Sequence, residues 1–496
     1  MTTRNVPTGT DHAGTGTGTA GTGTAGTVPA ASLLWYTDRS RITLGTARCA
    51  CARYLGYHFG PTGYGITLKA ESVPLSTGLT VHAGLEGFAG ILRDHDRLPD
   101  LAETRAIIAS VRADYETSVA ARGFRGILAG PLTDEIAAEQ STLISGLLWA
   151  LRLKFLPWLH ETYQVVSVET ERLHVLSCTC GAGPLDLPQH IARGCAGRVL
   201  MLRTDLLARR RTGTTLAYIE AKTTGWDSEA WAEQWEDNPQ LGLGTLDTAE
   251  EYGAEVAELY ILALAKGARR RDKADGEGGR KKQQSALCYG YCRPGSPPVM
   301  SDDWLPAYEW IDDTGQTKRA SRAHRRRGVW TLGESDWPSW RAYQATDPAL
   351  TPEEFWVRFL PPSVLDKICY LLGPMNRQDA QIQSLRRSID AEEARWQEKL
   401  WRLYEAEQAG LRWPDDAFQA LVDREIGRSW ACRPFGKEHQ CEFYGLCHRE
   451  VGWDDPLGSG RYQPRLPHHQ AELDAAVARG LLLAEAAPAA EAEERA

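Results

Sequence analysis

Two carboxylates and a lysine lie close together in the segment R-T-D-L-L-A-R-R-R-T-G-T-T-L-A-Y-I-E-A-K, and these side chains suit metal-dependent hydrolysis. Asp205 lies on one predicted strand, residues 212–215 form a turn, and Glu220 and Lys222 lie on the next strand. Side chains two positions apart on a strand point the same way, so Glu220 and Lys222 share a face that Asp205 can oppose. The carboxylates can bind Mg²⁺ or Mn²⁺, and the lysine can orient or deprotonate the attacking water.

Cysteines near the two ends of the chain form a second group of candidate ligands. Cys432, Cys441 and Cys447 lie in a turn-rich segment with Gly and Pro between them. Three thiolates need one more ligand to complete a Cys₄ iron–sulfur site, and we choose Cys51, with Cys49 as the alternative. The wide gap between Cys432 and Cys441 leaves zinc or free thiols open.

A third group of candidate ligands precedes Asp205. It consists of Cys178, Cys180, His190 and Cys195, whose side chains suit tetrahedral zinc. The Cys-x-Cys spacing is not the common zinc spacing, so zinc and ordinary loop thiols both stay open.

The strands that must carry these residues are predicted from apolar and β-branched runs between Gly- and Pro-bearing turns. Helical spacing of apolar residues brackets the strands, which indicates an α/β or α+β fold. We expect strands at 164–169, 173–177, 199–207, 216–221 and 257–265, and helices within 32–59, from about residue 77, over 101–125 and 133–160, in two pieces after residue 228, and over 382–403.

Both ends of the chain are expected to lie outside the folded core. Residues 1–30 are rich in Gly and Thr with few bulky apolar side chains, which predicts a disordered tail. Residues 456–496 are predicted to be a second tail, because the chain beyond about Leu466 is rich in Ala and Glu. Residues 31–455 would form the core domain, with helical insertions near 100–160 and 376–412.

The eleven cysteines are expected to be thiols or metal ligands, because a disulfide framework is typical of short secreted chains. The N-terminus lacks a basic-then-apolar signal pattern. The longest apolar stretch, 143–159, is interrupted by Arg152 and Lys154. We therefore expect a cytoplasmic protein without a membrane span.

The formal charge of -9 argues against a protein that coats nucleic acid uniformly, but two runs are strongly basic. The first spans 266–282 and the second spans 318–327. Lysine and arginine bind phosphates without regard to base sequence, so these runs could follow a DNA backbone. Arg325, Arg326 and Arg327 are our candidates for this contact.

Asp205, Glu220 and Lys222 occur in an order that resembles the PD-(D/E)XK nuclease superfamily, particularly its RecB-like exonucleases, the CRISPR-adaptation nucleases and their phage relatives. Asp205 matches the family's Asp strand, and Glu220 and Lys222 match its Glu-x-Lys motif. Gly78-x-x-x-His82 matches its Gly-x-x-x-His helix. The resemblance implies a restriction-endonuclease-like mixed-sheet core in which His82, Asp205 and Glu220 bind the metal.

The resemblance extends in patches from about Ser40 to Cys447. It assigns Gln240, with Gln234 as the alternative, to a motif that positions Lys222 or a phosphate. An acidic residue upstream of the Asp strand also recurs in such enzymes, and Glu169 fits it loosely.

In the iron–sulfur branch of this family, one cysteine precedes an Arg- and Tyr-rich helix and three cysteines follow the nuclease core. The arrangement of Cys51, Cys432, Cys441 and Cys447 is similar. It implies a [4Fe-4S] cluster, with zinc as the alternative.

Residues and resemblance together predict a metal-dependent DNA nuclease, expected to be an exonuclease acting on single-stranded DNA or duplex ends. One alternative is a non-catalytic iron–sulfur DNA-binding subunit on the same scaffold, against which the intact Asp, Glu and Lys set argues. A redox enzyme is a third hypothesis, but the chain has no Gly-rich nucleotide loop.

Overall fold

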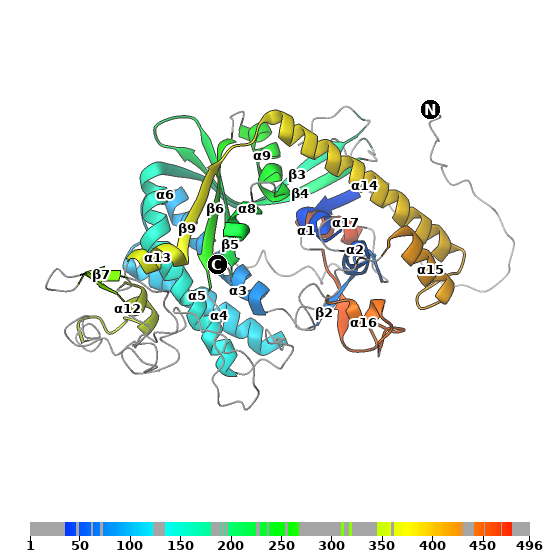
Figure 1. The fold of residues 1–496 in the computed structure, drawn as a ribbon, viewed down its shortest axis with the longest axis horizontal. Helices are drawn as coiled ribbons and strands as arrows, with labels where there is room; N and C mark the ends of the chain where they lie inside the picture. The colour runs from blue at the N-terminus through cyan, green and yellow to red at the C-terminus, as the bar shows by residue number, and fades with distance from the viewer. Residues whose placement is uncertain are drawn as a thin grey trace.

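Figure 1 shows the fold in a computed structural model of the chain. The predicted tail over 1–30 and the candidate residues Arg325, Arg326 and Arg327 lie outside the residues that the structure describes. The described residues are 35–45, 49–60, 63–69, 73–122, 134–178, 180, 189, 193, 197–224, 229–235, 238–252, 256–266, 309–311, 317–319, 345–358, 362–427, 429, 441–450, 452–467 and 469–478.

A mixed six-stranded sheet forms the centre of the protein, which confirms the expected α/β class. Its order is β1-β4-β5-β6-β9, and β3 pairs with the other edge of β4. The pairs β1–β4 and β5–β6 are parallel, and the remaining pairs are antiparallel. The strands are β1 (Trp35–Asp38), β3 (Tyr163–Ser177), β4 (Arg198–Arg210), β5 (Leu216–Thr224), β6 (Val256–Ala265) and β9 (Cys369–Met375).

One edge of β4 is shared between two strands, and this leaves a fork in the sheet. β1 pairs with residues Arg198 to Met201, and β5 pairs with residues Leu206 to Arg209. Residues 202–205 of β4 therefore lie between the ends of the two pairings. Beyond Ile219, β5 keeps its pairing with β6 and leaves β4. At the fork, this edge of β4 therefore has no strand of the described part paired with it between the β1 and β5 pairings.

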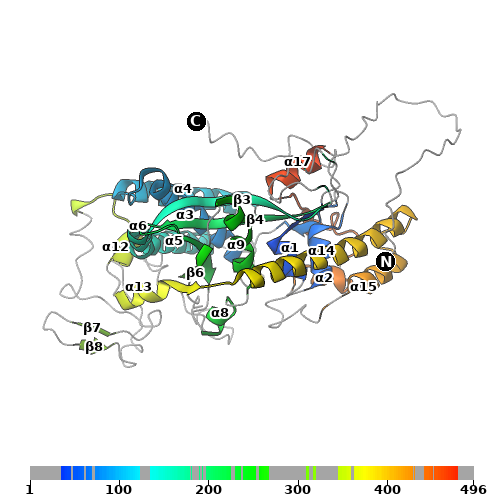
Figure 2. The same cartoon turned by 90° about the horizontal axis from the view of Figure 1, so that it is seen from above.

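Helices cover both faces of the sheet because its central strands are apolar on both sides. On β5, Ala217, Ile219 and Ala221 pack in the core formed with α3 to α6, whereas Tyr218 packs on the side of α9. In Figure 2, α4 and α14 lie on opposite sides of β3 and β4. The covering helices are α3 (Val73–His95), α4 (Leu101–Arg122), α5 (Asp134–Ala150) with its π-helical continuation Leu151–Phe155, α6 (Leu156–Thr162), α9 (Pro239–Tyr252) and α14 (Asp379–Gln408).

Shorter elements complete the described part of the chain. Two small sheets pair β10 with β2 and β7 with β8. The shorter elements are α1 (Arg39–Thr43), α2 (Ala50–Tyr57), β2 (Ile66–Leu68), α8 (Glu229–Glu233), β7 (Glu309–Ile311), β8 (Thr317–Arg319), α12 (Pro352–Arg358), α13 (Pro362–Ile368), α15 (Asp416–Glu425), α16 (Tyr444–Cys447), β10 (Tyr462–Pro464) and α17 (Gln470–Ala478).

The segment predicted as a tail over 456–496 belongs to the folded protein up to residue 478. α17 lies beside α1 (Figure 1), and Nη2 of Arg41 lies 2.6 Å from Oε2 of Glu472, with both side chains buried. Arg41 also donates to the Tyr36 carbonyl at 2.9 Å. The prediction was wrong because the Ala- and Glu-rich composition gives no sign that one glutamate has a buried partner 431 residues away.

Most predicted strands and helices are confirmed, with two informative differences. The two strands expected at 164–169 and 173–177 form one strand, β3, which is continuous despite the polar residues at its centre. The helix expected within 32–59 is preceded by a strand, β1, whose partner in β4 lies more than 160 residues away. Local apolar spacing does not report such a partner.

One described helical stretch, Gln140–Thr162, is long and apolar enough to cross a membrane by composition. However, 72% of its apolar window is buried inside the protein. Leu147, Leu148 and Leu151 belong to the core beneath α3. The stretch is a core helix of the fold.

We predict that Glu472→Ala lowers the free energy of unfolding by about 3 kcal/mol, because it removes one partner of a buried ion pair and leaves Arg41 under-compensated. Asp474→Ala is the matched control, since Asp474 is exposed on the same helix. Urea unfolding followed by tryptophan fluorescence measures both variants. Equal stability of the two would show that α17 does not hold α1.

Candidate metal centre

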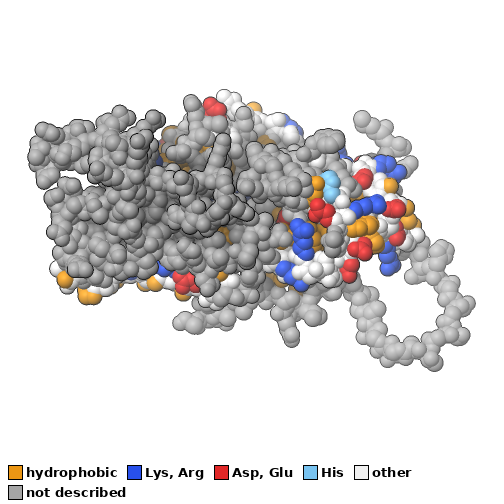
Figure 3. Space-filling model, turned by 60° about the horizontal axis from the view of Figure 1, so that its bottom comes forward, with side chains coloured by type: hydrophobic (Ala, Val, Ile, Leu, Met, Phe, Trp, Pro, Cys, Tyr) orange, Lys and Arg blue, Asp and Glu red, His pale blue; other side chains and the backbone are white. Residues whose placement is uncertain are grey.

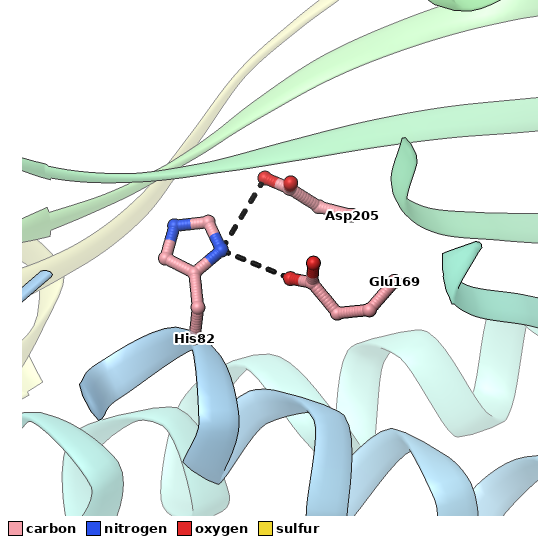
Figure 4. A group of neighbouring side chains, drawn as sticks. All are labelled: His82, Glu169 and Asp205. Carbon is pink, nitrogen blue, oxygen red and sulfur yellow. Dashed lines mark hydrogen bonds and ion pairs between the residues drawn. The ribbon is translucent and has the colours of Figure 1, made fainter. Parts of the chain in front are cut away.

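A close approach between α3 and β5 places His82 at the fork. A Cβ added to Gly78 would lie 3.2 Å from Oγ1 of Thr223, so a larger residue there would require the Thr223 side chain to move by a few tenths of an ångström. His82 follows one helical turn later and points toward the sheet (Figure 4). The Gly-x-x-x-His pattern therefore has a physical basis in this fold.

His82, Glu169 and Asp205 form a compact group of potential metal ligands (Figure 4). Nδ1 of His82 lies 3.1 Å from Oε1 of Glu169 and 3.7 Å from Oδ2 of Asp205. One ligand atom of each residue lies within 4.8 Å of the other two. Among the described residues, this is the one such group of three. Its members come from α3, β3 and β4.

The backbone of β3 is distorted where it supplies its ligand. Glu169 has a φ of 44°, in the left-handed region that glutamate rarely adopts. Its neighbours Val168 and Thr170 pair with Leu206 and Thr204, so Glu169 lies opposite Asp205. Such a conformation persists only where the surroundings stabilise it, and it is frequent at functional sites.

Asp205 is tied to the strand that carries the Glu-x-Lys motif. Its Oδ2 accepts a hydrogen bond from the backbone N–H of Ala221 at 2.8 Å. This contact crosses the opening between β4 and β5 and places the Asp205 carboxylate near Glu220. The expected proximity of Asp205 to Glu220 and Lys222 is therefore present in the structure.

Glu220 is close to the metal-ligand group but is held by other side chains. Lys222 and Tyr218 both donate hydrogen bonds to its carboxylate, which confirms that residues 218, 220 and 222 share a face. Arg39 Nη1 donates to Oε1 at 3.3 Å. The expected ligand set of His82, Asp205 and Glu220 thus differs from the observed group, in which Glu169 takes the third place.

Two of these contacts were not predicted from the sequence. Arg39 begins α1, directly after β1, and no local pattern distinguishes it from neighbouring arginines. Tyr218 is held under α9 at Gly244, where an added Cβ would lie 2.5 Å from the tyrosine ring. Tyr218 could have been identified from the alternation that pairs it with Glu220 and Lys222.

Burial and mutual repulsion shift the ionisation of the group. Burial, together with the nearby charge of Glu220, raises the pKa of Asp205 to about 6. Burial alone would lower the pKa of His82, but the Asp205 charge and the Glu169 hydrogen bond outweigh it and raise the pKa. The group therefore tends to retain protons that a bound cation would displace.

The pKa of Glu220 is lowered, whereas those of Asp205 and His82 are raised. Burial alone would raise its pKa, but the charges of Lys222 and Arg39 and the hydrogen bonds from Lys222 and Tyr218 lower it to about 2. Burial alone would likewise lower the pKa of Arg39, and the Glu220 charge raises it. The shifts of Glu220 and Arg39 thus both favour the charged forms.

The donor set fits a divalent cation. Two carboxylates and one imidazole converge, and carboxylate oxygens are the preferred ligands of Mg²⁺, while Mn²⁺ also accepts imidazole. Oε2 of Glu169 pairs with Arg203 at 2.7 Å, which fixes the orientation of that carboxylate. Orientation by a neighbouring ion pair is typical of metal ligands.

Two glutamines, Gln240 and Gln234, were also predicted for this site. Gln240 lies in the first turn of α9, and its side chain is outside the described part. Gln234 is exposed and donates to the carbonyl of Trp231 at 2.9 Å. Trp235 lies nearby, with its ring centroid 5.9 Å from Nζ of Lys222.

Cysteines from both ends of the chain meet in a second, separate place. Sγ of Cys51 lies 3.4 Å from Sγ of Cys447 in a buried apolar cluster that also contains Cys49 and Cys441. Burial raises the pKa of Cys441 to about 12, and Cys447 and Cys49 contribute in the same direction. Cys432 lies outside the described residues. Among the described residues these thiols do not form a compact ligand group of three, and both Cys49 and Cys51 stay open as candidate ligands.

The third predicted group is described only in part. Sγ of Cys178 and Sγ of Cys180 are 3.5 Å apart, and His190 and Cys195 lie outside the described residues.

We predict that Mn²⁺ binds wild-type protein more weakly as the pH falls through about 6, because protons then compete for Asp205. Glu169→Gln should weaken binding at every pH by at least roughly tenfold, since one charged ligand is lost. Titration calorimetry at several pH values measures both effects.

Asp94→Asn is the control, because Asp94 is an exposed carboxylate near the far end of the same helix α3. An affinity of Glu169→Gln equal to that of Asp94→Asn would exclude Glu169 as a ligand. An affinity without pH dependence would contradict the proton competition.

Comparison of the sequence with protein-family models and with curated proteins finds no match.

Proposed function

We propose that the protein is a metal-dependent DNA nuclease of the PD-(D/E)XK type. The observation that carries the proposal is the fork in the sheet, where His82, Glu169 and Asp205 converge beside the Glu220–Lys222 pair. Hard ligands next to a carboxylate and a lysine are the components that phosphodiester hydrolysis requires. The order of these residues along the chain, which resembles that superfamily, supports the same proposal.

In this proposal each side chain has a distinct role. Asp205, Glu169 and His82 would hold Mg²⁺ or Mn²⁺, and the cation would supply Lewis-acid polarisation of the phosphodiester. Glu220 accepts hydrogen bonds from Tyr218 and Lys222, so it fixes the position of the ammonium group. Lys222 orients the attacking water and offsets charge that develops on the phosphate.

Binding of DNA is proposed to combine this site with the basic runs at 266–282 and 318–327. Apart from Lys266 and the strand β8, both runs lie outside the described residues, as do Arg325, Arg326 and Arg327. On the face shown in Figure 3, basic and acidic side chains are interspersed over the described part. A mixed surface favours contact at particular phosphates over uniform coating, in agreement with the charge of -9.

The expected substrates are single-stranded DNA or duplex ends, and the expected action is that of an exonuclease in the cytoplasm. The chemistry of the site itself requires only a phosphodiester and a divalent cation.

We predict that Glu220→Gln and Lys222→Ala each reduce Mg²⁺- or Mn²⁺-dependent cleavage by at least about 100-fold, because each removes a charge that the transition state needs. Cleavage of end-labelled single- and double-stranded DNA is followed on denaturing gels, and circular dichroism checks the fold. Lys367→Ala is the control, because Lys367 is exposed on α13.

Wild-type rates in Glu220→Gln or Lys222→Ala would contradict the assignment. Wild-type protein that binds DNA without cleaving it would favour the non-catalytic DNA-binding subunit.

We propose further that the terminal cysteines hold a [4Fe-4S] cluster, with zinc as the alternative. Cys51 and Cys447 are separated by 396 residues but are in contact, so a metal that joins them closes a very long loop. Closing such a loop constrains the unfolded chain, so the centre would act as a structural staple.

We predict that protein purified without oxygen is brown and contains iron and acid-labile sulfide, and that Cys51→Ala, Cys432→Ala, Cys441→Ala and Cys447→Ala lose colour and melt at lower temperature. Cys49→Ala tests the alternative ligand. Cys369→Ala is the control for iron content, because Cys369 is buried in the core around α5 and the sheet. If zinc is the only metal found, the cysteines form a zinc site and not an iron–sulfur cluster. If no metal is found, they are plain thiols.

A further inference from the structure

Three arginines near the N-terminus differ in how their guanidinium groups are used. The Arg41 guanidinium group is buried, donates to the Tyr36 carbonyl and forms ion pairs with Asp38 and Glu472. Arg53 is buried, pairs with Glu393 at 2.7 Å and lies over a tryptophan ring. These two groups are committed to holding the fold together.

Arg39 is used differently. Its side chain is 33% exposed, and its one hydrogen bond within the described part of the chain is the 3.3 Å contact to Glu220. A guanidinium group carries five N–H donors in a planar fork that matches two oxygens of a phosphate. Arg39 therefore has unused donors at the edge of the candidate metal centre.

Glu220 would not lose its compensation if Arg39 turned to another anion. Lys222 and Tyr218 both donate to the same carboxylate, and their contacts are closer than that of Arg39. The cost of leaving a buried carboxylate unpaired is thus avoided. Arg39 can therefore give up its hydrogen bond to Glu220 and donate to a phosphate oxygen instead.

The other exposed arginine at the site is more firmly engaged. Arg203 is 52% exposed, but its Nε lies 2.7 Å from Oε2 of Glu169, a member of the metal-ligand group. Arg203 therefore holds Glu169, one of the candidate metal ligands, in place. Arg39 instead contacts Glu220, which is not one of those three ligands.

We propose that Arg39 binds a phosphate of the nucleic-acid strand at this centre, which rests on the nuclease function proposed above. The phosphate lies against the open side of the guanidinium group, between α1 and the Glu220–Lys222 pair.

The C-terminal helix holds Arg39 in place for this contact. Arg41, two residues after Arg39, is pinned by Glu472 of α17. Nδ1 of His469, the residue just before α17, lies 3.1 Å from Oε2 of Glu171. Glu171 follows Glu169 by two residues on β3. α17 thus connects the segments that carry Arg39 and one metal ligand, and it acts as a positioning element.

The test compares Arg39→Ala and Arg39→Lys with wild-type protein. Binding of a fluorescein-labelled single-stranded oligonucleotide is measured by anisotropy in Ca²⁺ buffer over a series of salt concentrations. Arg39→Ala should bind about tenfold or more weakly, because a charged hydrogen bond is lost, and the slope of log affinity against log salt should fall by about 0.7. Arg39→Lys should restore the slope but only part of the affinity, since it keeps the charge without the fork.

Cleavage kinetics and a matched control separate binding from structure. Arg39→Ala should raise KM more than it lowers kcat, and it should bind Mn²⁺ no more weakly than wild-type protein, because losing a nearby positive charge does not disfavour a cation. Arg424→Ala removes one exposed arginine from α15, which lies apart from the central sheet in Figures 1 and 2, and should change neither affinity nor slope. Oligonucleotides with a 5′-phosphate and with a 5′-hydroxyl distinguish the two sources: an effect confined to the former indicates a terminal phosphate, and an equal effect indicates a backbone diester.

Wild-type affinity, salt slope and KM in Arg39→Ala would overturn the proposal, as would an affinity loss equal to that of Arg424→Ala. Wild-type protein that binds DNA but does not cleave it would contradict the nuclease function, and the Arg39 comparison would still be decided by binding. Wild-type protein that binds no DNA would overturn both.

Discussion

The structure depends on the compensation of carboxylates that are buried together at one point of the sheet. Glu169, Asp205 and Glu220 are all largely buried, and each would be costly there without a partner. Glu169 is compensated by Arg203 and His82, and Glu220 by Lys222 and Arg39. Asp205 retains the least compensation, so its pKa is raised to about 6 by burial and by the Glu220 charge. A cation bound beside Asp205 would supply the compensation that the described residues do not.

The need to compensate these charges explains why distant segments converge on the fork. α3 supplies His82 through its close packing at Gly78, and α1 supplies Arg39 because β1 pairs in parallel with the first half of β4. α17 then holds α1 through the buried pair of Arg41 and Glu472. A long-range ion pair of this kind gives little net stability relative to apolar packing, but losing one partner is costly. It specifies where α1 lies, and so where Arg39 lies.

A second long-range constraint lies away from the fork. Cys51 and Cys447 meet in an apolar cluster that joins α2 to the segment around α16. The buried pair of Arg53 and Glu393 attaches the same part of the chain to α14, and Trp35 donates to that glutamate at 3.0 Å. The segments around α2 and α16 are thus anchored on the long helix α14.

The sequence alone determined the strands β3 to β6, the mixed α/β class, and the shared face of Glu220 and Lys222, because these follow from apolar runs and from two-residue alternation. The edge strands β1 and β9 were not predicted. Tertiary structure alone decided which residues complete the site. The partner of Arg41 lies 431 residues away, and that of β1 lies more than 160 residues away, so no local pattern encodes them. Glu169 enters the metal-ligand group, and Glu220 is held beside it, because the positive φ of Glu169 and the opening between β4 and β5 arise from packing of the whole sheet.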